Sequence, residues 1–192
     1  ESSRNVSCVG ALPVAITNNL NFASPETEIG YWQLSSACEG ISIACEALET
    51  PVTGGNVSLY NESIDDEGNK KPIQPTPVIG MVGILDNVKK AVSSEWKNIN
   101  DEIWIIGSRD SGLTLGATSY LEYFHGQVTG RPPKLNLVDE KLCQLFIRNG
   151  ISNNLIISCH DISDGGLAIA LAESCILSEK GASINLTGEE RK

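Results

Sequence analysis

Strands and helices alternate along this sequence, which predicts a fold of mixed α/β and α+β class. One observation behind this prediction is an apolar stripe at spacings of three and four through residues 29–48, typical of an amphipathic helix. Another is a set of short apolar runs of strand length, at 12–17, 78–85 and 102–107. With 192 residues, 41% of them apolar, the chain can bury a core.

In the first half, residues 4–9 have the pattern of a helix end, and we expect that helix to begin before the first residue. A strand at 12–17 follows and enters a polar loop at Asn18-Asn19. The helix at 29–48 stops before Pro51, because the residue before a proline disfavours helical backbone angles. The chain then continues into an extended segment.

The charged stretch 65–71 is predicted to be a solvated hairpin loop, and 78–85 a buried strand. The apolar signal weakens over 89–100, so we expect two domains, 1–95 and 96–192. In the second, the pattern predicts strands at 102–107, 155–159 and 182–186 and helices at 115–124, 139–148 and 167–177.

The segment 107–112 has the outer glycine spacing of a phosphate-binding P-loop. However, Leu113 stands where such a loop has its lysine. The segment is therefore predicted to be a strand-to-helix turn.

The charge of the chain limits its partners. The formal net charge is −10 and the pI is about 4.6, which disfavours nucleic acid and anionic membranes, since both attract basic patches. Only 14 residues are Lys or Arg, so a phosphate site here would depend on backbone N–H groups, Mg²⁺ and groups from outside the chain. We therefore expect an incomplete site.

The six cysteines show neither a Cys-x-x-Cys motif nor zinc-site spacing, which indicates reduced thiols used as small apolar residues. No apolar run approaches the roughly 20 residues of a membrane helix. The first residues also lack a signal-peptide pattern. The chain is predicted to be cytoplasmic.

The segment 51–63, PVTGGNVSLYNES, carries the first candidate site. Strand alternation puts Asn56 and Ser58 on one face, and small polar oxygens beside bare backbone suit a phosphate or its metal ion. A turn at Gly54 and Gly55 would let backbone N–H groups approach an anion where a Cβ atom would collide. The alternative is a β-turn or bulge with solvated Asn and Ser side chains.

The second candidate is HDISDGG at 160–166, between a predicted strand and a predicted helix. In one interpretation His160 and Asp161 present polar groups to a ligand or a neighbouring domain, because free N–H groups collect at a helix start. In the other, Asp164 is the N-cap and His160 is only hydrogen-bonded. The carboxylates of Asp161 and Asp164 would repel a phosphate, which favours an interface or structural role for this segment. His125 is predicted to cap a helix end rather than to be a catalyst.

Several short motifs of this sequence resemble, in residues and in order along the chain, the motifs of one known family. They are GALP at 10–13, TNNLNF at 17–22, GGNVSLYN at 54–61, PTPVIGMVG at 75–83 and HDISDGGL at 160–167. Over nearly its whole length the chain resembles the second half of the phosphoribosylformylglycinamidine synthases. The string at 54–61 is specific to that family rather than to nucleotide-binding proteins in general.

The resemblance implies a fold like that of aminoimidazole ribonucleotide synthetase. Residues 1–95 would then end a nucleotide-binding domain whose sheet joins a central barrel, and 96–192 would be a second α+β domain. The implied partners are the missing first half, a glutaminase and a small accessory subunit. An unpaired barrel edge also predicts self-association as a dimer.

The family converts formylglycinamide ribonucleotide, ATP and glutamine-derived ammonia into formylglycinamidine ribonucleotide. On the resemblance, Gly55 and Asn18 contact ATP or a structural ADP, Asn56 ligates Mg²⁺ and Ser58 touches the substrate. The family's catalytic histidines belong to the first half and have no counterpart here. The chain alone is therefore expected to be inactive.

Two residues depart from the family pattern. Asn18 stands where many relatives have Asp, and Ala23 where they have Gly. Because of these changes, the alternative remains that the chain is a structural or scaffolding module of the same fold. Another ATP-using relative, such as a selenophosphate synthetase or a hydrogenase-maturation protein, is a further alternative, although the N-terminal Gly-rich or Cys-bearing segments of those proteins are not visible.

Overall fold

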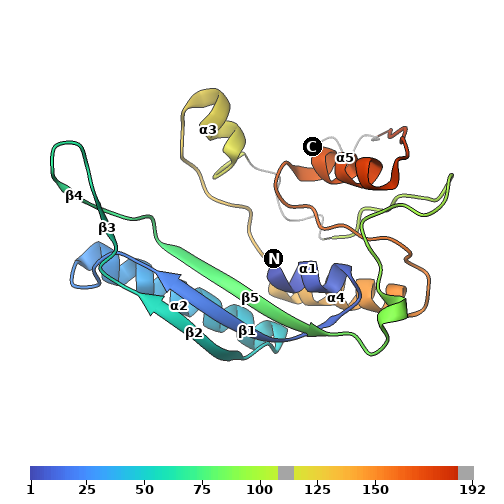
Figure 1. Cartoon of the computed structure of the whole chain (residues 1–192), viewed down its shortest axis with the longest axis horizontal. Coiled ribbons are helices and arrows are strands. Elements are labelled where there is room, and N and C mark those ends of the chain that lie inside the picture. The colour runs from blue at the N-terminus through green and yellow to red at the C-terminus, as the bar shows by residue number, and fades with distance from the viewer. Residues whose placement is uncertain (108–114, 186–192) are drawn as a thin grey trace.

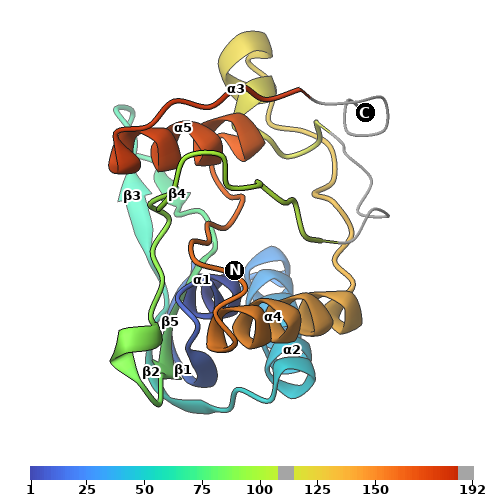
Figure 2. The same ribbon diagram turned by 90° about the vertical axis from the view of Figure 1, so that its right-hand side faces the viewer.

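The computed structural model describes residues 1–107 and 115–185 of the chain. A three-stranded sheet carries helices on one face, and a two-stranded hairpin projects from its end (Figures 1 and 2). The elements in chain order are α1 (Ser2–Cys8), β1 (Leu12–Asn21), α2 (Glu28–Leu48), β2 (Val52–Ser58), β3 (Glu62–Ile64), β4 (Lys70–Pro72), β5 (Thr76–Ile84), the 3₁₀ helix η1 (Val88–Lys90), α3 (Ser119–His125), α4 (Leu137–Ser152) and α5 (Gly166–Ser178).

β1 is the central strand of the sheet, whose order is β2-β1-β5. It pairs parallel to β2 and antiparallel to β5, and α2 supplies the crossover that the parallel pair requires. The loop predicted at Asn18-Asn19 is wrong, because β1 continues to Asn21. Asn18 has a strand partner on each side, Gly55 in β2 and Ile79 in β5, and this pairing overrides the local turn preference of asparagine.

Alternate residues of β1 face the helices and form the core. Ile16 and Leu20 of β1, and Phe22 directly after the strand, are 3%, 8% and 1% exposed. The opposite side of the sheet, here called the open face, carries Thr17, Asn19, Asn56, Val78 and Val82, and no helix of the described chain covers it (Figure 2). The strand at 78–85 predicted to be buried is thus present as β5, but Val78 and Val82 are 51% and 60% exposed.

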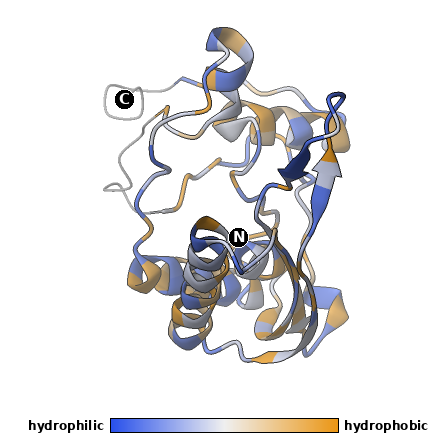
Figure 3. Cartoon of the chain, turned by 90° about the vertical axis from the view of Figure 1, so that its left-hand side faces the viewer, coloured by the Kyte–Doolittle hydropathy of each residue, from blue (hydrophilic) through white to orange (hydrophobic). Residues whose placement is uncertain are grey.

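Local sequence signals explain α2 and the hairpin, which confirm the elements predicted at 29–48 and 65–71. The Thr27 hydroxyl caps α2 by accepting a hydrogen bond from Gly30 N at 3.1 Å. In the β3–β4 turn, Asn69 N donates to Asp65 Oδ1 at 2.8 Å. This turn is hydrophilic (Figure 3) and projects from the end of the sheet (Figure 1).

The helices of the second half follow the predicted periodicity. α4 and α5 confirm the helices predicted at 139–148 and 167–177, while α3 is shorter than the helix predicted at 115–124. Gly126, with φ of +62°, ends α3 as its C-cap, directly after His125. The strand-to-helix turn predicted after residue 107 lies mostly outside the described residues.

The strands predicted at 102–107 and 155–159 are wrong, and residues 182–185 also form no strand. A strand exists only when another strand pairs with it. In this part of the described chain, Cys159 N donates to Ser93 O at 3.0 Å without a ladder around that bond. The apolar run at 102–107 therefore stays extended and largely exposed, with Trp104 73% exposed.

Hydrogen bonds between polar side chains connect α1 to α4. Arg4 pairs with Glu140 in two hydrogen bonds of 3.0 and 3.1 Å. The Ser3 hydroxyl donates to Gln144 Oε1 at 2.6 Å, and both residues are buried. Together with the confirmed helix near 4–9, these contacts join the beginning of the chain to its second half.

Replacing Glu140 with glutamine is expected to lower the free energy of unfolding at neutral pH by about 1 kcal/mol, because the pair is only partly exposed. Burial raises the pKa of Glu140, but hydrogen bonds from Arg4 and Gln144 and the charge of Arg4 outweigh it and hold the pKa below its ordinary value. The contribution of a carboxylate with a lowered pKa is complete above its unfolded pKa of about 4.3.

That contribution is lost as the pH falls through the lowered pKa of Glu140 in the folded state. The difference in the free energy of unfolding between wild type and variant should therefore disappear in acid. Denaturant unfolding at pH 7 and at stepwise lower pH measures it. The control is Glu49→Gln, which breaks the exposed 2.9 Å pair with Lys141 and should change stability by less than about 0.5 kcal/mol. Equal losses in both variants would contradict the prediction.

All six cysteines have free thiols. Within residues 1–107 and 115–185, the helices are too short or too polar to span a bilayer.

Candidate functional site

The three strands enclose a shallow hollow of about 420 Å³ near the middle of the sheet. Its lining residues are Thr17, Asn18, Asn19, Gly55, Asn56, Val78 and Gly80. None of them carries a charge, and three of them are asparagines. The hollow therefore offers amide and backbone groups to a ligand.

Strand register brings the polar side chains of the hollow together. Asn19 lies opposite Asn56 and Thr17 opposite Gly54 in the parallel pair β1–β2. Asn56 Nδ2 donates to Asn19 Oδ1 at 3.3 Å, and Thr17 Oγ1 donates to Gly54 O at 3.1 Å. The Asn56 amide group thus uses its NH₂ within the sheet, which leaves its Oδ1 to offer to a cation.

Gly54 and Gly55 lie within β2, so the turn predicted there is wrong. Neither has a positive φ. Their roles differ: a Cβ on Gly55 would collide with Oδ1 and the backbone O of Asn18, whereas a Cβ on Gly54 meets no atom within 4 Å. The register skips one residue between Ile16 and Thr17, an irregularity of the kind proposed as the alternative to a ligand site.

Bare backbone surrounds the hollow on two strands. Gly80 in β5 lies opposite Thr17, and a Cβ there would come within 3.0 Å of Thr17 Cγ2. β2 is an edge strand of the sheet, and an edge strand presents unpaired backbone N–H and C=O groups. A ligand that approaches this edge can therefore meet the main chain directly.

The pleat separates Asn18 from Asn56. Asn18 lies between the buried Ile16 and Leu20 and shares their helix-facing side, while Asn56 lies on the open face with its partner Asn19. Asn18 also borders a second hollow of about 250 Å³ beneath α2, lined by Cys38, Ile41, Ser42, Cys45, Glu46 and Val52. The structure thus places Asn18 between two hollows.

Ser58 ends β2 beyond the hollow. Its hydroxyl donates to Asn61 Oδ1 at 3.2 Å, and Asn61 Nδ2 donates to Ser58 O at 2.9 Å. Asn21 is its strand partner, so Ser58 shares the open face with Asn56 at a distance of two residues along the strand. The two candidate side chains can therefore contact different parts of one extended ligand.

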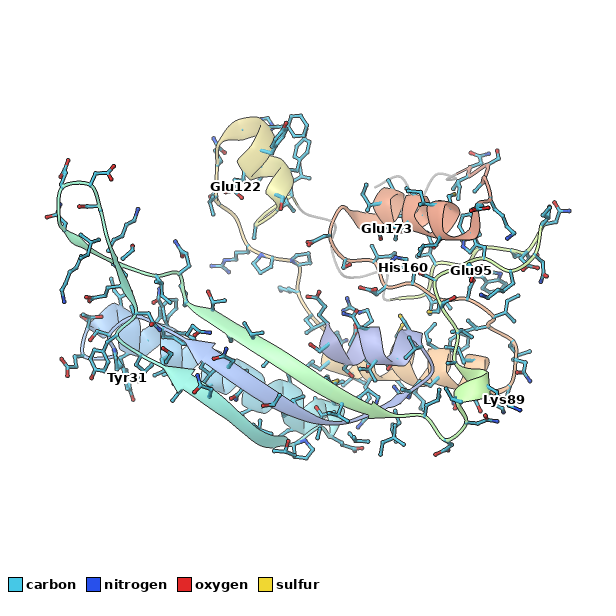
Figure 4. The ribbon with its side chains drawn as sticks, in the orientation of Figure 1. Tyr31, Lys89, Glu95, Glu122, His160 and Glu173 are labelled. Carbon is cyan, nitrogen blue, oxygen red and sulfur yellow. The ribbon has the colours of Figure 1, made fainter. Side chains whose placement is uncertain are left out.

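The residues of HDISDGG do not line the hollow. His160 lies beneath α5 between two carboxylates, with Nε2 3.0 Å from Glu173 Oε2 and Nδ1 3.3 Å from Asp161 Oδ1 (Figure 4). The N-cap of α5 is Gly165, with no side-chain cap, so the prediction of Asp164 as N-cap is wrong. A φ of +76° explains why glycine occupies position 165.

The lining of the hollow supports binding rather than proton transfer, because it contains no acid, base or thiol. Neutral amide oxygens are hard ligands that suit Mg²⁺, but they leave its charge to be balanced by phosphates or carboxylates. In the described residues, no group of three His, Cys, Asp or Glu side chains is placed to hold a metal. The donor set therefore fits a Mg²⁺ that arrives with a polyphosphate.

Sequence reasoning missed Thr17, Asn19, Val78 and Gly80 as members of the site. The alternation of Thr17 and Asn19 in β1 was the available signal. The local sequence instead predicts a loop at Asn19.

Two family models match the chain: "AIR synthase related protein, N-terminal domain" over residues 1–85, and the C-terminal domain of the same family over 98–191. A phosphoribosylformylglycinamidine synthase subunit PurL from Prochlorococcus marinus strain MIT 9312 is 74% identical over 97% of this chain and 24% of its own length. That of Thermosynechococcus vestitus is 52% identical over 97% of the chain and 25% of its length. The chain thus spans about a quarter of these curated relatives.

Among solved structures, T. maritima PurL complexed with FGAR matches 89% of this chain and 23% of its own length, with 27% identity and a TM-score of 0.57. A thiamine monophosphate kinase from Aquifex aeolicus matches 92% of this chain and 52% of its own, with 22% identity and a TM-score of 0.52. The second similarity shows a common fold.

Proposed function

This chain belongs to the family of AIR synthase related proteins, and from that premise we propose that it is the part of a phosphoribosylformylglycinamidine synthase that contributes a contact surface for ATP, Mg²⁺ and substrate. The complete enzyme would join glutamine-derived ammonia to formylglycinamide ribonucleotide at the expense of ATP. The observation that carries the proposal is the uncharged hollow, in which Asn19, Gly55 and Asn56 meet on adjacent strands.

Each residue of the hollow has a distinct part in this proposal. Asn56 offers its Oδ1 to Mg²⁺, with the side chain oriented by the 3.3 Å hydrogen bond to Asn19. Gly55 brings the edge of β2 close to the phosphates of ATP or of a structural ADP, while Asn18 positions Gly55 from the helix-facing side. Ser58 contacts the substrate farther along the open face. When bound, Mg²⁺ neutralises phosphate charge that this part of the chain cannot balance.

The absence of charge in the hollow also defines the partners. Because the described lining carries no acid or base, we propose that carboxylates for the metal and the catalytic groups come from other polypeptide, and that residues 1–192 alone are inactive. We assign these groups to a first half of the enzyme, or to a second copy that takes its place in a dimer. Ammonia would come from a glutaminase assisted by a small accessory subunit, in the cytoplasm. We assign residues 1–95 to a domain that ends a nucleotide-binding fold and 96–192 to a second domain.

Replacing Asn56 with alanine in the complete enzyme is expected to weaken Mg-ATP binding about 10- to 100-fold, because a hydrogen bond or ligand contact to a charged group contributes about 1.5–3 kcal/mol. Asn56 is exposed, so folding should be almost unaffected. Titration calorimetry with Mg-ATP and with ATP in the presence of EDTA measures the affinity. The loss should be largest when Mg²⁺ is present.

The control is Asn69→Ala, which removes an asparagine of the β3–β4 turn outside the hollow. Its affinity for Mg-ATP should equal that of the wild type. Unchanged Mg-ATP affinity in Asn56→Ala would refute the assignment of this hollow to the nucleotide and its metal.

A further inference from the structure

The turn that follows β2 brings the side chain of Asn61 against Ser58. Ser58 is the last residue of β2, and Asn61 directly precedes β3. Between them Tyr60 adopts a left-handed backbone conformation, with φ of +60°, which is uncommon for a residue other than glycine. The chain changes direction here, and two side chains that are three positions apart come within hydrogen-bond distance of each other.

Backbone hydrogen bonds fix the position of Asn61. Its N–H group donates to Phe22 O at 3.2 Å, and its C=O group accepts from Ile73 N at 3.2 Å. Ser58 O in turn accepts from Phe22 N at 3.0 Å. Phe22 is 1% exposed, so both Ser58 and Asn61 are tied to a residue of the core. The backbone therefore holds the Asn61 side chain beside Ser58.

The contacts of the Asn61 amide group determine which of its two terminal atoms is the nitrogen. One of them lies 2.9 Å from the backbone oxygen of Ser58, which can only accept a hydrogen bond, so this atom is Nδ2. Nδ2 also lies 3.1 Å from Ser58 Oγ, and Asn61 Oδ1 lies 3.2 Å from the same atom. The NH₂ group of Asn61 can thus donate to both oxygens of Ser58.

The Ser58 hydroxyl group has two orientations in this arrangement. In one, its proton points to Asn61 Oδ1. In the other, Asn61 Nδ2 donates to Oγ and the proton points away from Asn61. A hydroxyl group accepts and donates at the same time, so the second orientation keeps a contact with Asn61 and leaves the proton for a ligand. A hydrogen bond received by Oγ also strengthens the one that it donates.

We propose that Asn61 is a positioning residue, which makes the Ser58 hydroxyl group a hydrogen-bond donor to the substrate. This inference rests on the proposed function, in which Ser58 contacts formylglycinamide ribonucleotide from the open face. Because the hydroxyl group donates, the substrate atom that it meets is an acceptor oxygen of a phosphate or carbonyl group. Asn61 acts through Ser58 and does not itself touch the substrate.

A double-mutant cycle on the complete enzyme tests this role. Ser58→Ala and Asn61→Ala are each expected to weaken binding of formylglycinamide ribonucleotide about tenfold, the effect of losing one well-oriented hydrogen bond. The double variant should bind no more weakly than Ser58→Ala, because Asn61 acts only through the hydroxyl group. Titration calorimetry measures these affinities. The control Asn69→Ala makes the same change in the β3–β4 turn and should bind as the wild type does.

The affinity for Mg-ATP distinguishes a positioning role from a structural one. Neither Ser58 nor Asn61 lines the hollow assigned to the nucleotide, so all three variants of the cycle should bind Mg-ATP as tightly as the wild type. Displacement of β2 by misfolding of the turn would weaken binding of both ligands.

Asn61→Asp provides a second test that nearly preserves the shape of the side chain. A carboxylate accepts the Ser58 proton but cannot donate to Oγ, so it holds the hydroxyl group in the orientation that turns away from the substrate. We expect this variant to bind the substrate at least as weakly as Asn61→Ala. The control Asn87→Asp adds the same charge and can still accept from Lys89 N, and it should bind as the wild type does.

The possible results separate this role from the proposed function. If Ser58→Ala binds the substrate as tightly as the wild type, the assignment of Ser58 is wrong, and the role of Asn61 is wrong with it. If only Ser58→Ala weakens binding, or if the two losses add in the double variant, Asn61 does not act through Ser58, although the proposed function stands. Wild-type substrate affinity in Asn61→Asp, or an equal loss of Mg-ATP affinity in Asn61→Ala, would also overturn the positioning role.

Discussion

A single methyl group at position 55 is expected to destabilise the protein, while the same group at position 54 is not. The Cβ of Gly55→Ala would overlap both the side-chain and the backbone oxygen of Asn18. Backbone atoms cannot move aside without separating β2 from β1. Overpacking of this kind costs about 1–3 kcal/mol. We therefore expect Gly55→Ala to lower the free energy of unfolding by that amount.

Gly54→Ala is the matched control, because a Cβ at that position meets no atom within 4 Å. Its stability should equal that of the wild type or exceed it by about 0.4–1 kcal/mol, since alanine has fewer unfolded conformations than glycine. Denaturant unfolding without ligand compares the variants. Equal stability of Gly55→Ala and Gly54→Ala would show that the contact with Asn18 does not constrain the strand.

The same substitution has a functional consequence. Displacement of β2 moves Asn56 away from Asn19, whose 3.3 Å hydrogen bond orients it. Gly55→Ala should therefore weaken nucleotide binding by the complete enzyme by at least about tenfold, which corresponds to about 1.4 kcal/mol. Calorimetry with Mg-ATP measures this loss. It should accompany a weaker response to Mg²⁺, because the displaced Asn56 is the residue to which we assign the metal contact.

The sequence predicts the helices of this protein better than its strands. The stripe through residues 29–48 predicts α2 because the helical hydrogen bonds and the apolar face are both local to the segment. A strand depends on a partner that may be distant in sequence. The apolar run at 102–107 has strand composition but no strand pairs with it in the described chain, and Asn18 and Asn19 have turn composition but are paired on both sides.

The candidate site shows the same limit. The string at 54–61 predicts Gly55 and Asn56 as candidate site residues, and both line the hollow. Asn19 and Gly80 belong to the hollow only because the register places them opposite Asn56 and Thr17. Pairing across strands decides which small or polar residues share a site, and one sequence read alone does not contain that register.

The second prediction with a large expected effect concerns association of the chain through the open face of the sheet. Beside the polar hollow and beyond it, this face carries Leu12, Val78, Val82 and Ile84, each more than half exposed. Both outer strands, β2 and β5, also have a free edge in the described chain. Burial of apolar side chains and pairing of free edges favour association. We therefore expect this chain to pair through the open face, with the first half of the enzyme or with a second copy.

A lysine at position 82 should disrupt that pairing. Val82 is 60% exposed, so Val82→Lys has little effect on the unpaired chain, but pairing would bury an uncompensated charge at a cost of several kcal/mol. Association should weaken more than about 100-fold, the equivalent of about 2.8 kcal/mol. Light scattering over a range of protein concentrations measures the association of the 192-residue chain.

Val88→Lys is the control, because Val88 is 79% exposed in η1 and lies outside the sheet. It makes the same change of residue and charge, so any general effect of added positive charge on association appears in both variants. Only Val82→Lys should separate the partners. Two results would show that the open face is not the surface through which this chain pairs. One is an unmodified chain that is a monomer with a well-dispersed NMR spectrum. The other is an equal weakening of association by both lysines.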